Sequence, residues 1–128
     1  MLNPATHTLY AVSDPENGAV GSVSVINASA CNALRAAGCA GNTPYVQVGN
    51  GPGAIAVDQA TDTVYVVNSN SSTVSVINGA ACNARHTTGC SRTPPVIKLP
   101  ENPVDVAVNQ ATDTVYVANW GNGAGTTV

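Results

Sequence analysis

The chain has 128 residues, enough for one ordinary domain, and only 9% of them are charged, which gives a net charge of −3. The few lysine and arginine residues are scattered along the chain, which argues against a nucleic-acid-binding surface. No apolar run approaches the roughly 18 to 20 residues that a membrane-spanning helix needs. The composition favours a folded domain whose surface carries neutral hydroxyl and amide groups.

The first unit of the chain, residues 1–50, is predicted to lack its first strand. Its opening segment Met1–Tyr10 aligns with Ala107–Tyr116, so the chain begins near the end of a strand. A hairpin strand at Leu9–Val12 and a long turn at Ser13–Ser22 follow. The first residues do not have the pattern of a signal peptide. We therefore interpret the chain as a fragment of a longer protein whose signal sequence is absent from it.

Residues 51–101 are predicted to form one complete unit of four strands. The first strand is a short apolar run after Gly-Pro-Gly, and the second is rich in β-branched and aromatic residues. The expected strands are Ala54–Asp58, Thr63–Asn68, Thr73–Asn78 and Pro95–Leu99. No segment keeps a sustained 3.6-residue period, so helices are not expected as main elements. The pattern therefore predicts an antiparallel meander.

The last unit, residues 102–128, is a half copy of the unit before it. The strand Val64–Asn68 recurs as Val115–Asn119, an offset of 51 residues (64 to 115). A Gly- and Asn-rich tip at Asn119–Gly125 carries the only tryptophan, Trp120. This side chain could contact a protein or a carbohydrate, or it could pack at the edge of a sheet. A fixed period of this length is typical of repeat architectures.

One four-stranded sheet is too small to bury both of its faces, so the units must pack against one another. Radial packing gives a β-propeller of typically four to eight four-stranded blades, and a linear stack of sheets is the alternative. We predict an all-β protein of antiparallel four-stranded meander blades, an incomplete ring of about two and a half blades. The remaining blades would come from the parent chain or from another copy. Another copy is less favoured, because the two partial units do not add up to one complete blade.

The hairpin strands carry a motif that resembles a known family. Tyr65–Asn68 (YVVN) and Tyr116–Asn119 (YVAN) each follow Thr-Asp-Thr-Val. This pattern resembles the YVTN family of β-propeller repeats, although the third motif position is Val67 or Ala118 instead of threonine. The resemblance covers essentially the whole chain. It implies a secreted or cell-surface protein with perhaps seven blades, in a wider group that includes lactonase-like and quinoprotein-like propellers.

Two segments share the pattern Cys-Asn-Ala-x4-Gly-Cys, one in each of the first two units. Three pairings of four cysteines are possible. The local disulfides, Cys31 with Cys39 and Cys82 with Cys90, are favoured because each unit carries its own pair. Closing such a loop stabilises a protein by roughly 2 to 3 kcal/mol in the chain-entropy model. The glycine before the second cysteine is expected to supply free backbone for the closure.

The cysteine spacing also bears on the alternatives and on the compartment. It matches neither the Cys-x2–4-Cys of structural zinc sites nor the Cys-x-x-Cys of redox motifs. Paired structural disulfides are typical of oxidising compartments. The sequence therefore predicts an extracytoplasmic location, either secreted or at the cell surface.

A small set of polar residues is a candidate for a site in a propeller channel. Asp58, Asp105 and Asn109 lie near the strands expected to line that channel. The alternative for the two carboxylates, Asp58 and Asp105, is that they cap turns by accepting hydrogen bonds from nearby backbone N–H groups. His7 and His86 are expected to be solvated, one in a turn and one in a disulfide loop. We predict no catalytic residue, no metal ligand and no cofactor, because no catalytic or phosphate-binding motif is present.

The favoured functional hypothesis is a non-enzymatic repeat module that acts as a binding or interaction scaffold. Its ligand would be a protein or a carbohydrate, recognised by the variable loops. The alternative is a fragment of a lactonase-like or lyase-like propeller enzyme whose active site lies in the central channel. An enzyme of that kind needs acids and histidines that converge from several inner strands, and these units supply few of them.

Overall fold

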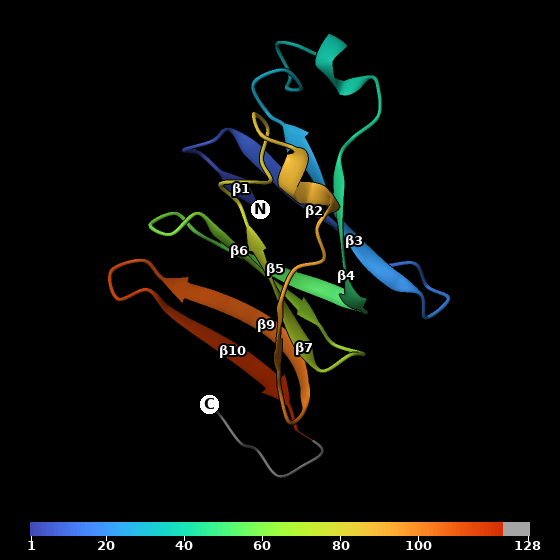
Figure 1. The fold of residues 1–128 in the computed structure, drawn as a ribbon, viewed down its shortest axis with the longest axis vertical. Helices are drawn as coiled ribbons and strands as arrows, with labels where there is room; N and C mark the ends of the chain where they lie inside the picture. Colours follow the sequence, from blue (N-terminus) through green and yellow to red (C-terminus); the bar gives the residue numbers. More distant parts are fainter. Residues whose placement is uncertain (122–128) are drawn as a thin grey trace.

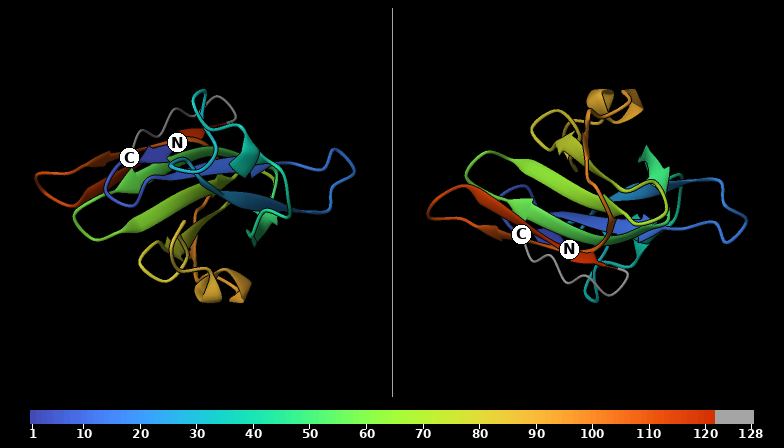
Figure 2. Two further views of the ribbon diagram at one scale, coloured as in Figure 1. Left: turned by 90° about the horizontal axis from the view of Figure 1, so that it is seen from above. Right: turned by 90° about the horizontal axis from the view of Figure 1, so that it is seen from below.

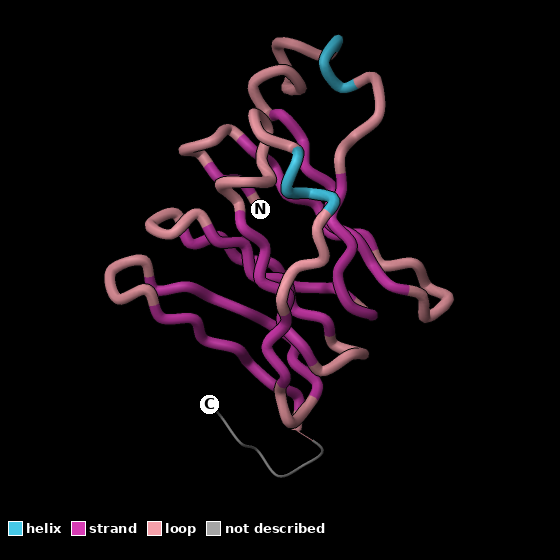
Figure 3. The backbone as a smooth tube through the Cα atoms, in the orientation of Figure 1, coloured by secondary structure: helices cyan, strands magenta, loops and turns pink. Residues whose placement is uncertain are grey.

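The computed structural model describes residues 1–121 as a series of antiparallel β-sheets that follow one another along the chain (Figure 1). Within that range the only helical segments are two short 3₁₀ turns, η1 (Ala37–Cys39) and η2 (Thr88–Ser91), and Figure 3 shows both of them in loops. The prediction of an all-β chain without main helices is confirmed. No helix of the described residues is long and apolar enough to cross a membrane.

The first sheet is formed by residues 1–50 and has four strands in chain order. They are β1 (Leu2–Asn3), β2 (Thr8–Ser13), β3 (Val20–Asn27) and β4 (Tyr45–Asn50). Strand β1 has only two residues and pairs with the start of β2. The first strand of this unit was predicted to be lacking. A two-residue strand is present at that position.

The second sheet matches the predicted complete unit. Its strands are β5 (Pro52–Asp58), β6 (Thr63–Asn68), β7 (Thr73–Asn78) and β8 (Val96–Lys98), again in chain order. The two central strands have the predicted bounds. Strand β5 begins two residues earlier than expected (residue 52 instead of 54), and β8 is shorter than the predicted segment because prolines flank it on both sides.

The third sheet contains β9 (Asn102–Asn109) and β10 (Thr114–Trp120), paired antiparallel. It corresponds to the predicted half unit as far as the described residues extend. The tip expected at Asn119–Gly125 lies largely outside the described residues. The antiparallel sheets therefore have four, four and two strands.

The turn between the first two strands of each unit has the same unusual backbone. His7, Asp62 and Asp113 have φ values of 51°, 50° and 50°, in the left-handed region. Asp, Asn and His tolerate this region better than most non-glycine residues. The three positions correspond in the repeat alignment. Equivalent residues of the three units therefore have the same backbone conformation. His7 is exposed, as predicted.

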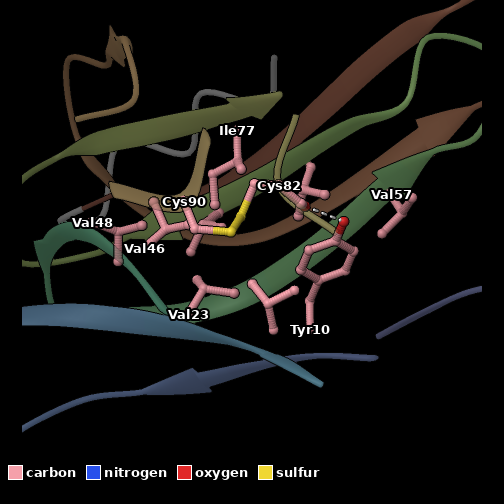
Figure 4. Packing of buried hydrophobic residues seen from close by; sticks show 11 residues of the cluster. Tyr10, Val23, Val46, Val48, Val57, Ile77, Cys82 and Cys90 are labelled. Atoms are coloured by element: carbon pink, nitrogen blue, oxygen red, sulfur yellow. Dashed lines mark hydrogen bonds between the residues drawn. A yellow bond between two sulfur atoms is a disulfide. The ribbon is translucent and has the colours of Figure 1, made fainter. Parts of the chain in front are cut away.

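The sheets pack face to face. Figure 2 shows this arrangement from above and from below. We call the side of a sheet that is turned toward the next unit in the chain its forward face, and the opposite side its backward face. The forward face of the first sheet and the backward face of the second share one core, seen in Figure 4. Its buried members include Val23, Val25, Val46, Val48, Val57, Val64, Val66 and Ile77. Each fully buried valine or isoleucine contributes roughly 1.5 to 3 kcal/mol.

The second and third sheets form a smaller core. Its buried members are Ala56, Val67, Val74 and Val106. The most extensive contact between these sheets is between β5 and β9, the first strand of each unit. The chain passes from β4 to β5 through the single residue Gly51, whose φ of 65° favours glycine. Consecutive units are thus joined directly, last strand to first strand.

Candidate functional site

Both predicted disulfides are present. Cys31 is bonded to Cys39 and Cys82 to Cys90, with Cα–Cα distances of 4.7 Å and 4.8 Å. Each closes the connector between the third and fourth strands of its unit, and the chain has no free cysteine. We call residues 28–44 the first disulfide loop and residues 79–95 the second disulfide loop. Disulfides of this kind are typical of oxidising compartments.

The two disulfides have different surroundings although their sequences correspond. Cys82 and Cys90 are only 1% and 4% exposed and belong to the core between the first two sheets. Cys31 is half-buried and Cys39 is exposed. The second disulfide loop lies on the forward face of the first sheet, as Figure 4 shows, so its disulfide is covered. The second disulfide loop therefore packs on the unit that precedes its own.

Two hydrogen bonds fix the second disulfide loop to the first sheet. The Tyr10 hydroxyl donates to the Cys82 carbonyl oxygen over 2.9 Å (Figure 4). The Ala84 N–H donates to Thr8 Oγ1 over 2.9 Å. Tyr10 has no exposed surface. Burial, together with the negative charge of Asp62, raises the pKa of Tyr10 to about 12, against the opposing effect of a hydrogen bond with Thr8. We call these two bonds the loop clasp.

The glycine before the second cysteine is required for a different reason from the one expected. Neither Gly38 nor Gly89 has a positive φ, so the closure does not depend on glycine's backbone freedom. A Cβ atom at Gly89 would lie 2.7 Å from the Ala81 carbonyl oxygen, and one at Gly38 would lie 2.0 Å from the Ala30 carbonyl oxygen. The glycine is therefore needed because the two ends of each loop approach too closely for a side chain.

Two of the polar residues predicted near a channel, Asp58 and Asn109, form hydrogen bonds in the turns of their own hairpins. Asp58 is 1% exposed; its Oδ1 accepts a hydrogen bond from the Ala60 N–H over 3.0 Å and its Oδ2 accepts one from the Thr61 hydroxyl over 2.9 Å. Asn109 accepts the equivalent bond from the Ala111 N–H over 3.0 Å. The first unit repeats this arrangement with Asn3 and the Ala5 N–H over 3.1 Å. For Asp58 this matches the turn-capping alternative.

Asp105 lies elsewhere, within β9, and is exposed; its Oδ1 accepts a hydrogen bond from the N–H of the next residue, Val106. Among residues 1–121 no group of three or more His, Cys, Asp and Glu side chains could hold a metal ion. His86 is exposed in the second disulfide loop, as expected. Trp120, the last residue of β10, is 71% exposed, and so does not pack at the edge of the described sheet.

A groove lies between the two disulfide loops, at the start of β4, and has a volume of about 560 Å³. Hydroxyl and amide side chains line it together with one phenol and one guanidinium. These include Gln47, Thr87, Ser91, Thr93, Tyr45 and Arg92. Tyr45 is 57% exposed and Arg92 is exposed. Such a surface can hydrogen-bond a neutral polar ligand, stack an aromatic face on it and accept one negative charge.

Neither Tyr45 nor Arg92 was expected from the sequence to form part of a site. Tyr45 begins β4 of the first unit and Arg92 lies in the second disulfide loop, and no motif connects them. One available signal was that each follows the second cysteine of its loop by a few residues, where the loop returns to its sheet. No protein-family model, curated protein or solved structure matches this chain.

Proposed function

We propose that this chain is an extracytoplasmic binding module in which propeller blades carry disulfide-closed loops, and that it binds a carbohydrate in the groove between those loops. The observation that carries the proposal is the groove itself. It is formed by the ends of two loops that are each closed by a disulfide, and the second is held by the loop clasp. Rigid loops lose little conformational entropy when a ligand binds.

The groove chemistry favours an oligosaccharide that carries a carboxylate. Amide and hydroxyl groups such as Gln47, Thr87 and Ser91 complement sugar hydroxyls. The exposed ring of Tyr45 offers an apolar face for a sugar ring, and Arg92 is a donor for a carboxylate. The volume of about 560 Å³ lies within the range typical of small-ligand sites.

The packing supports the propeller part of the proposal. Each of the first two sheets runs in chain order from its first to its fourth strand, and the fourth strand leads directly to the next sheet. Successive sheets pack face to face through apolar cores. Radial repetition of such sheets is what a propeller requires. The two disulfides support an oxidising compartment, and we propose secretion or surface attachment as the route to it.

The proposal is tested by screening the labelled, disulfide-intact protein against immobilised neutral and uronic-acid-containing oligosaccharides, followed by calorimetry on the ligands retained. We expect binding to acidic oligosaccharides. Arg92→Ala should weaken that binding roughly 10-fold or more, because hydrogen bonds to charged groups contribute about 1.5 to 3 kcal/mol. Tyr45→Ala should weaken it as well.

Two exposed residues outside the groove serve as matched controls for these variants. Arg85→Ala removes a cation from the same loop, and Tyr116→Ala removes a tyrosine that is 53% exposed on β10. Neither residue lines the groove, so both variants should bind as the parent protein does. Retention of no oligosaccharide, or equal losses in all four variants, would contradict the proposal.

A further inference from the structure

Two corresponding cavities lie under the two disulfide loops, and they differ in what lines them. The cavity of the first unit has a volume of about 210 Å³, and part of its lining is Ala84 and Thr87 from the second disulfide loop. The cavity of the second unit is larger, about 410 Å³. Its lining includes Val76 and Pro95, the counterparts of Val25 and Pro44 in the first cavity. No following disulfide loop lines it within the described residues.

The hydrogen-bonding groups beside this cavity repeat those of the loop clasp. The hydroxyl oxygens of Thr61 and Thr63 lie 2.9 Å apart, as those of Thr6 and Thr8 do in the first unit. Thr8 accepts a further bond from the second disulfide loop, whereas Thr63 receives none within residues 1–121. Tyr65, the counterpart of Tyr10, is half-buried.

The Tyr65 hydroxyl likewise makes no hydrogen bond within residues 1–121. The apolar surroundings correspond as well. Val46 of the first sheet is 1% exposed because the second disulfide loop covers it, while its counterpart Ile97 on β8 is 46% exposed. The forward face of the second sheet thus repeats the groups that hold a disulfide loop in the first, without a loop on it in the described part of the chain.

We propose that this face, around Thr63, Tyr65 and Ile97, is a docking site for a disulfide-closed Cys-x7-Cys loop of another repeat unit. The Tyr65 hydroxyl donates to the carbonyl oxygen of the first cysteine of that loop. Thr63 Oγ1 accepts a hydrogen bond from the N–H two residues after that cysteine, as Thr8 does from Ala84. Thr63, Tyr65 and Ile97 do not line the carbohydrate groove, and the proposal does not depend on carbohydrate binding.

The first disulfide loop of this chain shows what the occupant would look like. It has the same Cys-Asn-Ala-x4-Gly-Cys pattern as the loop that docks on the first sheet. Ala33 occupies the position of Ala84, and Leu34 beside it is 95% exposed. A synthetic, oxidised peptide of residues 28–44 therefore carries the groups that the docking site would recognise, without the sheet to which they are normally attached.

The test is a titration of that oxidised peptide into isotope-labelled full-length protein, followed by NMR. We expect saturable shifts of the amide signals of Thr63, Tyr65, Val76 and Ile97. Tyr65→Phe and Thr63→Val should each weaken peptide binding about 2- to 10-fold, the loss of one net hydrogen bond. Tyr45→Phe, a change in the groove, is the matched control and should leave peptide binding unchanged.

A peptide in which serine replaces both cysteines should bind more weakly, because an open loop must lose more conformational freedom. Circular dichroism of each variant confirms that it is folded. The proposal is overturned by an absence of saturable shifts at millimolar peptide, by shifts confined to the groove or the third sheet, or by unchanged binding of the folded Tyr65→Phe and Thr63→Val variants.

Discussion

Removing the Tyr10 hydroxyl, one of the two donors of the loop clasp, should lower the free energy of unfolding. Tyr10→Phe keeps the ring that packs against Val23, Val25 and Ile77 but deletes the hydroxyl that donates to the Cys82 carbonyl oxygen. That carbonyl oxygen then loses this donor inside the protein. The loss of a net hydrogen bond contributes about 0.5 to 1.5 kcal/mol, and an unsatisfied buried group costs about 1 to 3 kcal/mol. We therefore expect a decrease of about 2 kcal/mol in the free energy of unfolding.

Urea unfolding, followed by circular dichroism, measures this decrease, and thermal unfolding should show a fall in Tm of roughly 5 to 10 °C. The matched control is Tyr116→Phe. Tyr116 occupies the same position in the third unit but is 53% exposed, so its change should stay within about 0.5 kcal/mol. Equal effects of the two substitutions would refute the assignment of the clasp, because only Tyr10 is bonded to a following loop.

Further predictions concern the pH dependence, the glycine and the disulfides. Because the pKa of folded Tyr10 is raised from 10.0 to about 12, its contribution is fully present below pH 10 and is lost as the pH rises toward 12, so the stability difference from Tyr10→Phe should shrink in that window. Gly89→Ala should lower Tm, because its Cβ would lie 2.7 Å from the Ala81 carbonyl oxygen. Replacing Cys82–Cys90 by two serines should destabilise more than replacing Cys31–Cys39, because only the first change also disturbs a buried core; equal urea midpoints would contradict this.

The 51-residue period made the strands predictable. Once Val64–Asn68 was matched to Val115–Asn119, the hairpins of the second and third units followed with small errors at their ends. The disulfide pairing was predictable for the same reason, because each unit carried a complete pair. Turn capping by Asp58 and Asp105 was one of two interpretations; the hydrogen bonds of Asp58 agree with it, whereas Asp105 lies within β9 and not in a turn.

The surroundings of equivalent residues could not be predicted from the repeat. Tyr10, Tyr65 and Tyr116 share one motif position, yet they are buried, half-buried and exposed in that order. Their burial depends on whether a following unit covers them, which the local sequence does not specify. The same holds for the two disulfides, of which only Cys82–Cys90 is buried.

A single residue in another unit can also change the role of a motif residue. Asn68 accepts a hydrogen bond from the Gly49 N–H over 3.1 Å and donates to the Ser75 hydroxyl over 2.9 Å. Its counterpart Asn119 has a buried Oδ1 with no partner among residues 1–121. The position that corresponds to Gly49 is Pro100, which has no N–H to donate. Whether the motif asparagine has a hydrogen-bond donor therefore depends on a residue 19 positions earlier in the chain, such as Gly49 for Asn68.

The second disulfide loop packs on the forward face of the first sheet, and the other interpretations of this fold depend on that packing. A nuclear Overhauser spectrum of the isotope-labelled, disulfide-intact protein measures it. We expect cross-peaks from the Tyr10 ring protons to Cys82 and Ile77, and from the Ala84 amide proton to Thr8. A Tyr10 ring with cross-peaks only to residues of its own sheet would contradict it, because the second disulfide loop would then not lie on the first unit.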